Sequence, residues 1–234
     1  MPLKPTFHPH FARIFKKPLN YKCSSLKNEP SSKAKLIGII ILAAGASRRM
    51  GPPKQLLKID GQTLIERTIA LTQVIDNQKT VVVLGANADK IRPYIPQQEK
   101  VNVIVNEDWQ QGMGTTLRKG MDFFLRQADN FKAVVVMVCD QPYLTSEKLQ
   151  QLIHQYKATK AAIIATAYNG IKGVPALFDN SLFSKLITLN KDEGARKIIK
   201  NFKGTVATID FPEGVIDLDT PESYQKFLAK HNNN

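Results

Sequence analysis

Residues 36–54 read LIGIIILAAGASRRMGPPK, and this stretch is the most informative part of the chain for predicting the fold. Its first part is almost entirely apolar and rich in isoleucine, which is typical of a buried strand. The strand leads into a loop with three cationic side chains: Arg48, Arg49 and Lys54. Gly45 and Gly51 permit a positive φ and a close backbone approach, and the cations neutralise negative charge. We therefore predict that this loop binds a polyphosphate.

Other glycine-containing motifs do not fit the spacing. A Walker A loop reads G-x-x-x-x-G-K-[ST], whereas here five residues separate Gly45 from Gly51 and two prolines precede Lys54. No third glycine completes a dinucleotide-binding fingerprint, and Ser47 lacks the following glycine of a nucleophile elbow. An ordinary strand-to-helix turn remains the alternative to a phosphate-binding loop.

From residue 36 onward, apolar runs alternate with segments of helical periodicity. This alternation predicts an α/β fold of three layers, a Rossmann-like, mostly parallel central sheet covered by helices on both faces. Strands are predicted at 36–42, 80–84, 101–105, 133–138, 161–166, 206–209 and 215–218. Helices are predicted at 62–75, 87–91, 115–127, 145–156, 180–189, 194–201 and from 221 onward. No repeat or linker interrupts residues 36–230, which predicts one domain.

Composition favours a folded domain with an anionic ligand. The chain of 234 residues is 43% hydrophobic and carries a net charge of +13, which favours negatively charged partners. The cations are not interleaved with aromatics in a basic block, so we expect no nucleic acid partner. No apolar stretch approaches the roughly 20 residues that cross a bilayer, so we expect no membrane association. Two cysteines form no disulfide framework, which favours a reducing, cytoplasmic location.

The first 35 residues differ from the rest of the chain. They contain eight lysines and arginines, five prolines and a single acidic residue, Glu29. The segment lacks the apolar core of a secretion signal and the arginine enrichment of a transit peptide. We expect residues 1–35 to be a flexible basic extension and residues 231–234 to be a flexible tail.

A second glycine-rich loop follows the predicted strand 101–105. Residues 106–118 read NEDWQQGMGTTLR, in which Gly112 and Gly114 precede a predicted helix. Such glycines let the backbone approach a base or ribose, and the first N–H groups of the helix face the ligand. Because Gly-x-Gly before a capped helix is also common in plain turns, this pattern alone leaves both interpretations open.

Carboxylates follow two of the predicted strands. Asp140 stands at the end of the strand 133–138 in the phrase CDQP, where it is well placed to bind Mg²⁺. Asp219 ends the last predicted strand before a Thr-Pro pair that suits a helix start. Asp217 is predicted to point to the other side of that strand and is the second choice. A capping role is the alternative for Asp140 and for Asp219.

Together these phrases resemble a known family. LAAGASRRMGPPK (42–54) resembles the opening motif of the nucleotidyltransferases that act on the molybdenum cofactor. LAAG followed by KQLL is most similar to their cytidylyltransferase branch. GMGTTLR (112–118), CDQP (139–142) and DTPE (219–222) are similar to further family motifs and stand in the family's order. The resemblance covers about residues 36–230 and implies the family's nucleotidyltransferase fold.

The resemblance implies roles for individual residues. It implies nucleotide binding by Leu42, Ala43, Ala44, Gly45, Arg49, Gly51, Lys54, Gly112, Gly114 and Thr115. It implies a site for Mg²⁺ or Mn²⁺ on Asp140 and Asp219, and catalytic roles for Arg49, Lys54 and Asp140. GVPALF (173–178) and DEGAR (192–196) are similar to the acceptor-site segments, which implies acceptor contacts by Gly173, Pro175, Asp192 and Arg196. Lys191 stands where the family usually has glycine.

The implied reaction is nucleotidyl transfer. CMP would pass from CTP to the phosphate of the molybdenum–molybdopterin cofactor with release of pyrophosphate, and a molybdenum hydroxylase apoprotein would be a further partner of the monomer. Ala44 favours the smaller base, because guanylyl-transferring relatives usually have glycine there. The alternatives are a transferase of the same fold that uses GTP or a sugar or polyol phosphate, and a carrier that hands over the cofactor without catalysis. Retention of Lys54 and the two aspartates argues against a carrier.

Overall fold

The apolar stretch that opens the sequence forms the central strand of a sheet. In the computed structural model, which describes residues 36–232, this strand is β1 (Leu36–Ala43). Side chains alternate along it, so Ile39 and Ile41 join the hydrophobic cluster on one face while Ile40 and Leu42 join the cluster on the other. Both faces are covered, which explains why the strand reads as a continuous apolar run. The predicted extension 1–35 and the last two residues lie outside the described range.

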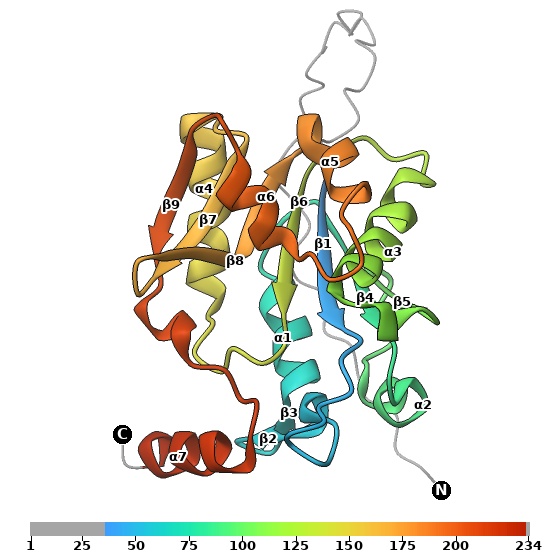
Figure 1. The fold of residues 1–234 in the computed structure, drawn as a ribbon, viewed down its shortest axis with the longest axis vertical. Coiled ribbons are helices and arrows are strands. Elements are labelled where there is room, and N and C mark those ends of the chain that lie inside the picture. Colours follow the sequence, from blue (N-terminus) through green and yellow to red (C-terminus); the bar gives the residue numbers. More distant parts are fainter. Residues whose placement is uncertain (1–35, 233–234) are drawn as a thin grey trace, which may run out of the picture. The chain divides into compact units, whose positions relative to one another are not determined.

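Seven strands form the main sheet in the order β5-β4-β1-β6-β8-β7-β9 (Figure 1). The other six are β4 (Gln78–Leu84), β5 (Val101–Val105), β6 (Phe131–Val138), β7 (Ile163–Tyr168), β8 (Ile171–Asp179) and β9 (Val206–Asp210). Every neighbouring pair is parallel except the two pairs of β8, which runs antiparallel to β6 and β7. The predicted mostly parallel α/β fold is confirmed.

The strand order places a crevice beside β1. From β1 the chain proceeds outward to β4 and β5, and it then returns to the other side of β1 as β6. In open α/β sheets a ligand binds where the strand order reverses in this way, outside the carboxyl ends of the two strands. Here those ends are followed by the loop 44–54 and by Cys139 and Asp140.

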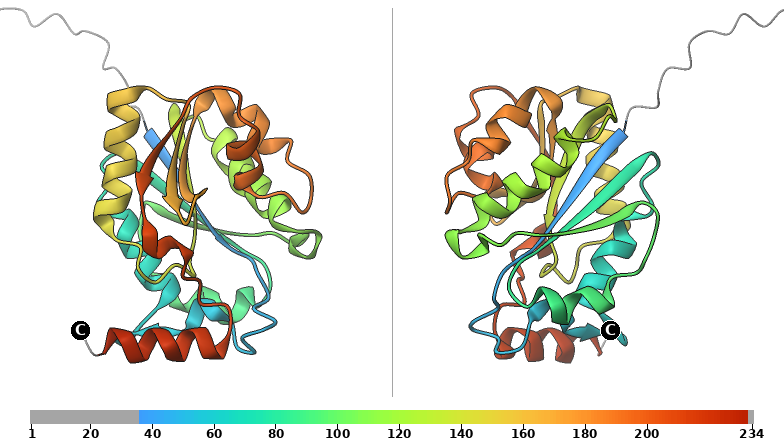
Figure 2. Two further views of the ribbon diagram at one scale, coloured as in Figure 1. Left: turned by 60° about the vertical axis from the view of Figure 1, so that its left-hand side comes forward. Right: turned by 90° about the vertical axis from the view of Figure 1, so that its right-hand side faces the viewer.

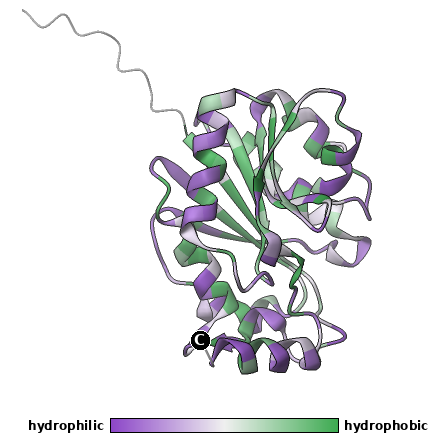
Figure 3. Ribbon diagram, turned by 90° about the vertical axis from the view of Figure 1, so that its left-hand side faces the viewer, coloured by the Kyte–Doolittle hydropathy of each residue, from purple (hydrophilic) through white to green (hydrophobic). Residues whose placement is uncertain are grey.

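Helices cover both faces of the sheet and make three layers (Figure 2). One face carries α1 (Leu64–Thr72), α2 (Ala88–Ile91) and α4 (Ser146–Thr159). The other face carries α3 (Met113–Leu125), α5 (Phe183–Ile187) and α6 (Ala195–Asn201). Figure 3 shows the strands as mainly hydrophobic and the outward side of α4 as hydrophilic, as expected for amphipathic helices over a buried sheet. No helix between residues 36 and 232 is long and apolar enough to span a membrane.

The last helix anchors the C-terminal segment beneath the first loop. A two-stranded hairpin, β2 (Lys58–Ile59) with β3 (Gln62–Thr63), packs against α7 (Pro221–His231) around Ile59, Leu64, Leu218 and Phe227. The Tyr224 hydroxyl donates to the Lys58 carbonyl oxygen at 2.6 Å. This packing carries the segment 216–220 back across the molecule to the ends of β1 and β6. His231, which was predicted to begin a flexible tail, is the last residue of α7.

Several predicted elements need correction. Residues 215–218 are not a strand: Pro212–Val215 is a 3₁₀ turn, and an irregular extended segment leads from it to α7. Strand β8 was not predicted, because glycine and proline within it are typical strand breakers.

The predicted helix start at Thr145 is confirmed, since its side chain accepts a hydrogen bond from the Lys148 N–H. The predicted cap at Thr220 is likewise confirmed by its bond from the Ser223 N–H.

Candidate active site

Two adjoining pockets open at the carboxyl ends of β1 and β6. The larger pocket has a volume of about 590 Å³ and the smaller pocket about 210 Å³. Both are lined by Leu42, Gly45, Lys54, Met113, Val138 and Asp140, so they form one continuous site. Their position is the one that the strand order predicts for a ligand.

The loop 44–54 is held in shape from behind by one buried glutamine. Gln55 is 1% exposed, and its Nε2 donates to the carbonyl oxygens of Ala43 at 2.9 Å and Gly45 at 3.2 Å. Its Oε1 accepts a hydrogen bond from the Ser47 hydroxyl, and that hydroxyl oxygen accepts one from the Lys54 N–H at 3.0 Å. Because these carbonyl groups are bound from the inside, the loop conformation is set before any ligand arrives.

The backbone of this loop differs from the prediction at one position. Gly51 has a positive φ of 86°, as expected, but the second residue in the left-handed region is Ser47 with φ of 53°. Gly45 is not in that region, and a Cβ added to it would meet no atom within 4 Å. The open space at Gly45 faces the shared part of the two pockets, which lets a ligand approach the main chain there.

Lys54 lies between the two predicted metal ligands. Its ammonium group pairs with Asp140 and donates to Asp219 Oδ1 at 2.7 Å. Arg49 donates to the other oxygen of Asp219 at 2.6 Å. These four residues come from three segments separated by up to 170 positions in the sequence, and the fold brings all of them into the larger pocket.

The pKa values reflect this concentration of charge. Burial would lower the pKa of Lys54, but the charge and hydrogen bonds of Asp140 and Asp219 outweigh it and raise that pKa well above its usual value. Burial would raise the pKa of Asp219, but hydrogen bonds and charge from Lys54 and Arg49 lower it. Both groups are therefore ionised near neutral pH. Burial raises the pKa of the Cys139 thiol to about 12, so Cys139 is a packing residue and no nucleophile.

The residues present suit a divalent cation. Asp140 Oδ1 is buried and has no hydrogen-bond partner, so this carboxylate oxygen is left unpaired beside the pocket that Asp140 lines. Asp140 and Asp219 both contact the same ammonium group, so one cation can bind both. Carboxylate oxygens are the preferred protein ligands of Mg²⁺ and Mn²⁺. Within residues 36–232 no group of three or more His, Cys, Asp or Glu is arranged around a common point, so further ligands would be water and substrate.

Asp217 also belongs to the site, contrary to the prediction that it points away. It lines the larger pocket together with Asp219. In an extended segment residues i and i+2 lie on the same side, while Leu218 between them is buried in the cluster around α7. Partial burial and the negative charges of Asp140 and Asp219 raise the pKa of Asp217 to about 6.

The second glycine-rich loop forms the wall of the smaller pocket. Trp109 and Gly112 line it, and Gly112 has a positive φ of 113°. Asn106, 3% exposed, donates to the hydroxyls of Thr115 and Thr116 at 2.9 Å and 3.1 Å and ties the end of β5 to the start of α3. Neither Gly114 nor Thr115 lines either pocket.

Gly114 instead permits close packing between two parts of the site. Its N–H donates to the Lys191 carbonyl oxygen at 2.9 Å, and a Cβ at this position would lie 2.0 Å from the Asn190 carbonyl oxygen. The segment 190–194, which resembles the acceptor phrase, therefore rests directly on the start of α3. Gly114 was predicted to contact the nucleotide, but in the structure it is this backbone contact that requires a glycine.

Two of the four predicted acceptor residues line the larger pocket and two do not. Asp192 and Arg196 line the larger pocket together with Arg49 and Lys54 of the loop 44–54. Gly173 and Pro175 do not, although Val174 between them does. A Cβ on Gly173 would lie 2.1 Å from the Tyr168 hydroxyl oxygen, so this glycine makes room for the Tyr168 side chain, which does line the pocket.

Sequence reasoning missed several residues of the site. Lining residues that were not among the predicted site residues include Ser47, Gln55, Met113, Thr116, Val138, Gln141 and Tyr168. Gln55 stands directly after Lys54 in the quoted motif, but its burial and its bonds to the loop carbonyl groups follow from the fold and gave no signal in the sequence. Met113 lines both pockets although half of it is exposed (50%), and nothing in its local sequence distinguishes it from a helix-start residue.

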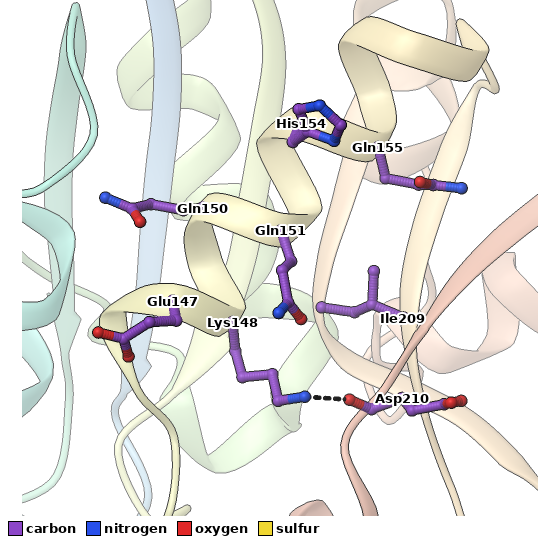
Figure 4. A pocket seen from close by; sticks show the side chains of 8 residues that line it. All are labelled: Glu147, Lys148, Gln150, Gln151, His154, Gln155, Ile209 and Asp210. Atoms are coloured by element: carbon purple, nitrogen blue, oxygen red, sulfur yellow. Dashed lines mark hydrogen bonds between the residues drawn. The ribbon is translucent and has the colours of Figure 1, made fainter.

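A further pocket lies on the outside of α4 against β9 (Figure 4). Its lining side chains are polar except for Ile209, and Lys148 donates from Nζ to the Asp210 carbonyl oxygen at 2.6 Å. None of the predicted site residues lines it. The pocket at β1 and β6 is therefore the candidate active site.

Comparison with known proteins assigns the family. Residues 39–206 match the MobA-like NTP transferase domain. The chain is 30% identical over 200 residues to nicotine blue oxidoreductase of Paenarthrobacter nicotinovorans, which covers 81% of this chain and 95% of that protein. It is also 30% identical over 200 residues to the purine catabolism protein PucB of Bacillus subtilis (strain 168), which covers 81% of this chain and 94% of PucB.

Solved structures agree with this assignment. Rv0371c from Mycobacterium tuberculosis H37Rv superimposes with a TM-score of 0.72 at 28% identity, over 84% of this chain and 98% of that chain. A complex of the same protein with manganese gives a TM-score of 0.68 at 26% identity, over 83% and 99%. Fold and site together define an enzyme of the nucleotidyltransferase type. The chain belongs to the MobA-like NTP transferase domain family, which confirms the resemblance seen in its motifs.

Proposed function

We propose that this enzyme transfers CMP from CTP to the phosphate of the molybdenum–molybdopterin cofactor and releases pyrophosphate. The observation that carries the proposal is the position of Lys54 between Asp140 and Asp219 at the switch point of the sheet. A lysine for phosphate and a carboxylate pair for a divalent cation are the groups that phosphoryl and nucleotidyl transfer require. The family name, which refers to NTP transfer, supports the same chemistry.

The two pockets suit the two substrates. The smaller pocket, walled by Ala44, Trp109 and Gly112, would hold base and ribose. The loop 44–54 with Arg49 and Lys54 would hold the β- and γ-phosphates and stabilise charge on the departing pyrophosphate. Asp192 and Arg196 on the far wall of the larger pocket would orient the acceptor phosphate for in-line attack.

Asp140 and Asp219 would hold Mg²⁺ or Mn²⁺. When bound, the cation supplies Lewis-acid neutralisation of the reacting phosphates. The manganese complex of the similar Rv0371c supports a divalent metal in this chain as well. Lys54 would then turn from the carboxylates to the phosphates, which its position at the boundary of both pockets permits.

The preference for CTP rests on the smaller pocket. Ala44 is 5% exposed and lines this pocket of about 210 Å³. A Cβ built on Gly85 would lie 2.8 Å from the Ala44 methyl group, so the absence of a side chain at Gly85 lets Ala44 pack closely against the chain that follows β4. One methyl group is worth about 1–3 kcal/mol of discrimination. We expect CTP to react faster than GTP, and Ala44→Gly to reduce the difference.

The decisive experiment measures pyrophosphate released from each of the four nucleoside triphosphates, with and without molybdenum cofactor. Lys54→Ala should lower kcat by about tenfold to a hundredfold, or about 1.4–2.7 kcal/mol in the barrier, because its contact strengthens as charge develops on pyrophosphate. The matched control is Lys58→Ala, an exposed lysine on β2 outside both pockets. Circular dichroism checks that Lys54→Ala, which leaves Asp140 without its cation and Asp219 with Arg49 alone, remains folded.

The same experiment separates the alternatives. Equal turnover of GTP would exclude the CTP preference. Turnover only when a sugar or polyol phosphate is added would identify that compound, rather than the molybdenum cofactor, as the acceptor. A carrier would bind cofactor without forming pyrophosphate, and its handover to a molybdenum hydroxylase apoprotein would not depend on Lys54. Because one relative bears an oxidoreductase name, pyrophosphate is the appropriate readout, since a redox reaction releases none.

A further inference from the structure

A second groove adjoins the larger pocket on the side of Arg196. It has a volume of about 960 Å³ and lies between the start of β8, the helix α6 and the loop that leads into β9. We call it the basic groove and define it by Lys172, Arg196, Lys197, Ile199, Lys200 and Phe202. None of the predicted nucleotide or metal residues lines it.

The basic groove has an excess of positive charge. No aspartate or glutamate lines it. Lys197 pairs with Glu193, whereas Lys172, Arg196 and Lys200 make no ion pair with any residue between 36 and 232. Lys172 comes from β8 and Lys200 from α6, so cations approach the groove from two separate elements. Such an arrangement raises the local concentration of anions.

The groove also offers apolar surface from Ile171, which is 38% exposed at the hairpin turn, and from the half-buried Phe202. Ile199 also lines the groove but is almost fully buried. Apolar side chains between cations suit an anionic group that is attached to a ring or other apolar body. A free inorganic phosphate would use only the cations.

Arg196 lines both the basic groove and the larger pocket. A molecule with its reacting phosphate in the larger pocket would therefore reach the groove by extending past Arg196. We propose that the basic groove binds a second anionic group of the acceptor, carried on an apolar or ring-shaped body. This assignment rests on the proposed function, because it takes the larger pocket as the place of the reacting phosphate.

The test compares removal of the same net charge inside and outside the basic groove. The groove variant is Lys172→Gln with Lys200→Gln, which leaves Arg196 in place. The control is Lys119→Gln with Lys157→Gln, two exposed lysines on α3 and α4 that lose the same net charge and line neither the pockets nor the groove. For each protein, binding of molybdenum cofactor is measured without nucleotide by pterin fluorescence, and KM values for cofactor and CTP are measured by pyrophosphate release.

We expect the groove variant to weaken cofactor binding and raise its KM about tenfold, with the KM for CTP within twofold of the wild type. The effect should shrink in 0.5 M salt, because exposed charges are screened. Equal losses in both variants, or no loss in the groove variant, would overturn the assignment. Failure of the wild type to form pyrophosphate would refute the proposed function instead, while the fluorescence measurement would still test the groove. Absence of cofactor binding to the wild type would overturn both.

Discussion

Gly114→Ala tests whether the packing between α3 and the segment 190–194 organises the site. The added Cβ would lie 2.0 Å from the Asn190 carbonyl oxygen and 2.9 Å from that of Glu193. Real contacts of this kind are essentially never under 3.0 Å, so the segment must move by about 1 Å. Both opposing atoms belong to the backbone, and no side-chain rotation can relieve the contact.

Two opposing contributions decide the size of the effect. Alanine within a helix is favoured over glycine by about 1 kcal/mol. Overpacking against backbone costs about 1–3 kcal/mol, and loss of the bond from the Gly114 N–H to Lys191 costs about 0.5–1.5 kcal/mol more. The expected net loss of stability is about 1–3 kcal/mol, which lowers Tm by roughly 2–10 °C in a domain of this size.

The assay combines thermal unfolding with kinetics. The KM for the acceptor should rise more than the KM for CTP, because the displaced segment carries Asp192 and leads into Arg196. Gly45→Ala is the control for stability, since an added Cβ there meets no atom within 4 Å. If Gly114→Ala matches the control in Tm and leaves the acceptor KM unchanged, the contact has no organising role.

Three further outcomes are expected. Gln55→Ala should cost about 2–3 kcal/mol in urea unfolding and raise the KM for CTP, because two loop carbonyl groups lose a buried donor; an unchanged KM would contradict this. Asp217→Asn should raise Tm in chelator at pH 8 but not at pH 4, because a folded-state pKa of about 6, above its usual value of 3.8, means that stability falls as Asp217 ionises. After allowance for solvent screening the gain is about 1 kcal/mol. Tyr156→Phe should cost about 1 kcal/mol at pH 7, because the hydroxyl donates to the Asp179 carboxylate, and a loss below about 0.3 kcal/mol would show that this bond is not stabilising.

Most of the fold could be predicted because the strands of a covered parallel sheet are apolar on both faces. β1, β6 and the second half of β4 are nearly continuous apolar runs, and such runs can be recognised as strands without knowledge of their partners. β8 could not be predicted, since Gly173 and Pro175 interrupt its pattern for reasons that lie in tertiary contacts. At Gly173 that reason is the Tyr168 side chain, which no local rule can supply.

The site was predictable where its chemistry depends on residue type, and unpredictable where it depends on distance. Glycines, cations and carboxylates stood out at strand ends, and Lys54, Asp140 and Asp219 do share one pocket. The interpretation of Asp217 was wrong on two counts. It assumed a strand at 215–218, and it placed Asp217 and Asp219 on opposite sides although residues two apart in an extended segment share a side. Pairing between Arg49 and Asp219 spans 170 positions and follows only from the packing of α7 beneath the first loop.

The ion pairs explain how a concentrated set of carboxylates is tolerated before substrate binds. Asp140 and Asp219 would repel one another in a partly buried pocket, and Lys54 removes that cost by contacting both. If Lys54 turns to a polyphosphate, Asp219 keeps Arg49 as its partner, whereas Asp140 has no second ion pair within residues 36–232 and needs another cation. A metal–nucleotide complex supplies the anion and the cation together. If the proposed roles of Lys54 and Asp140 hold, we therefore expect metal and nucleotide to bind jointly rather than nucleotide alone.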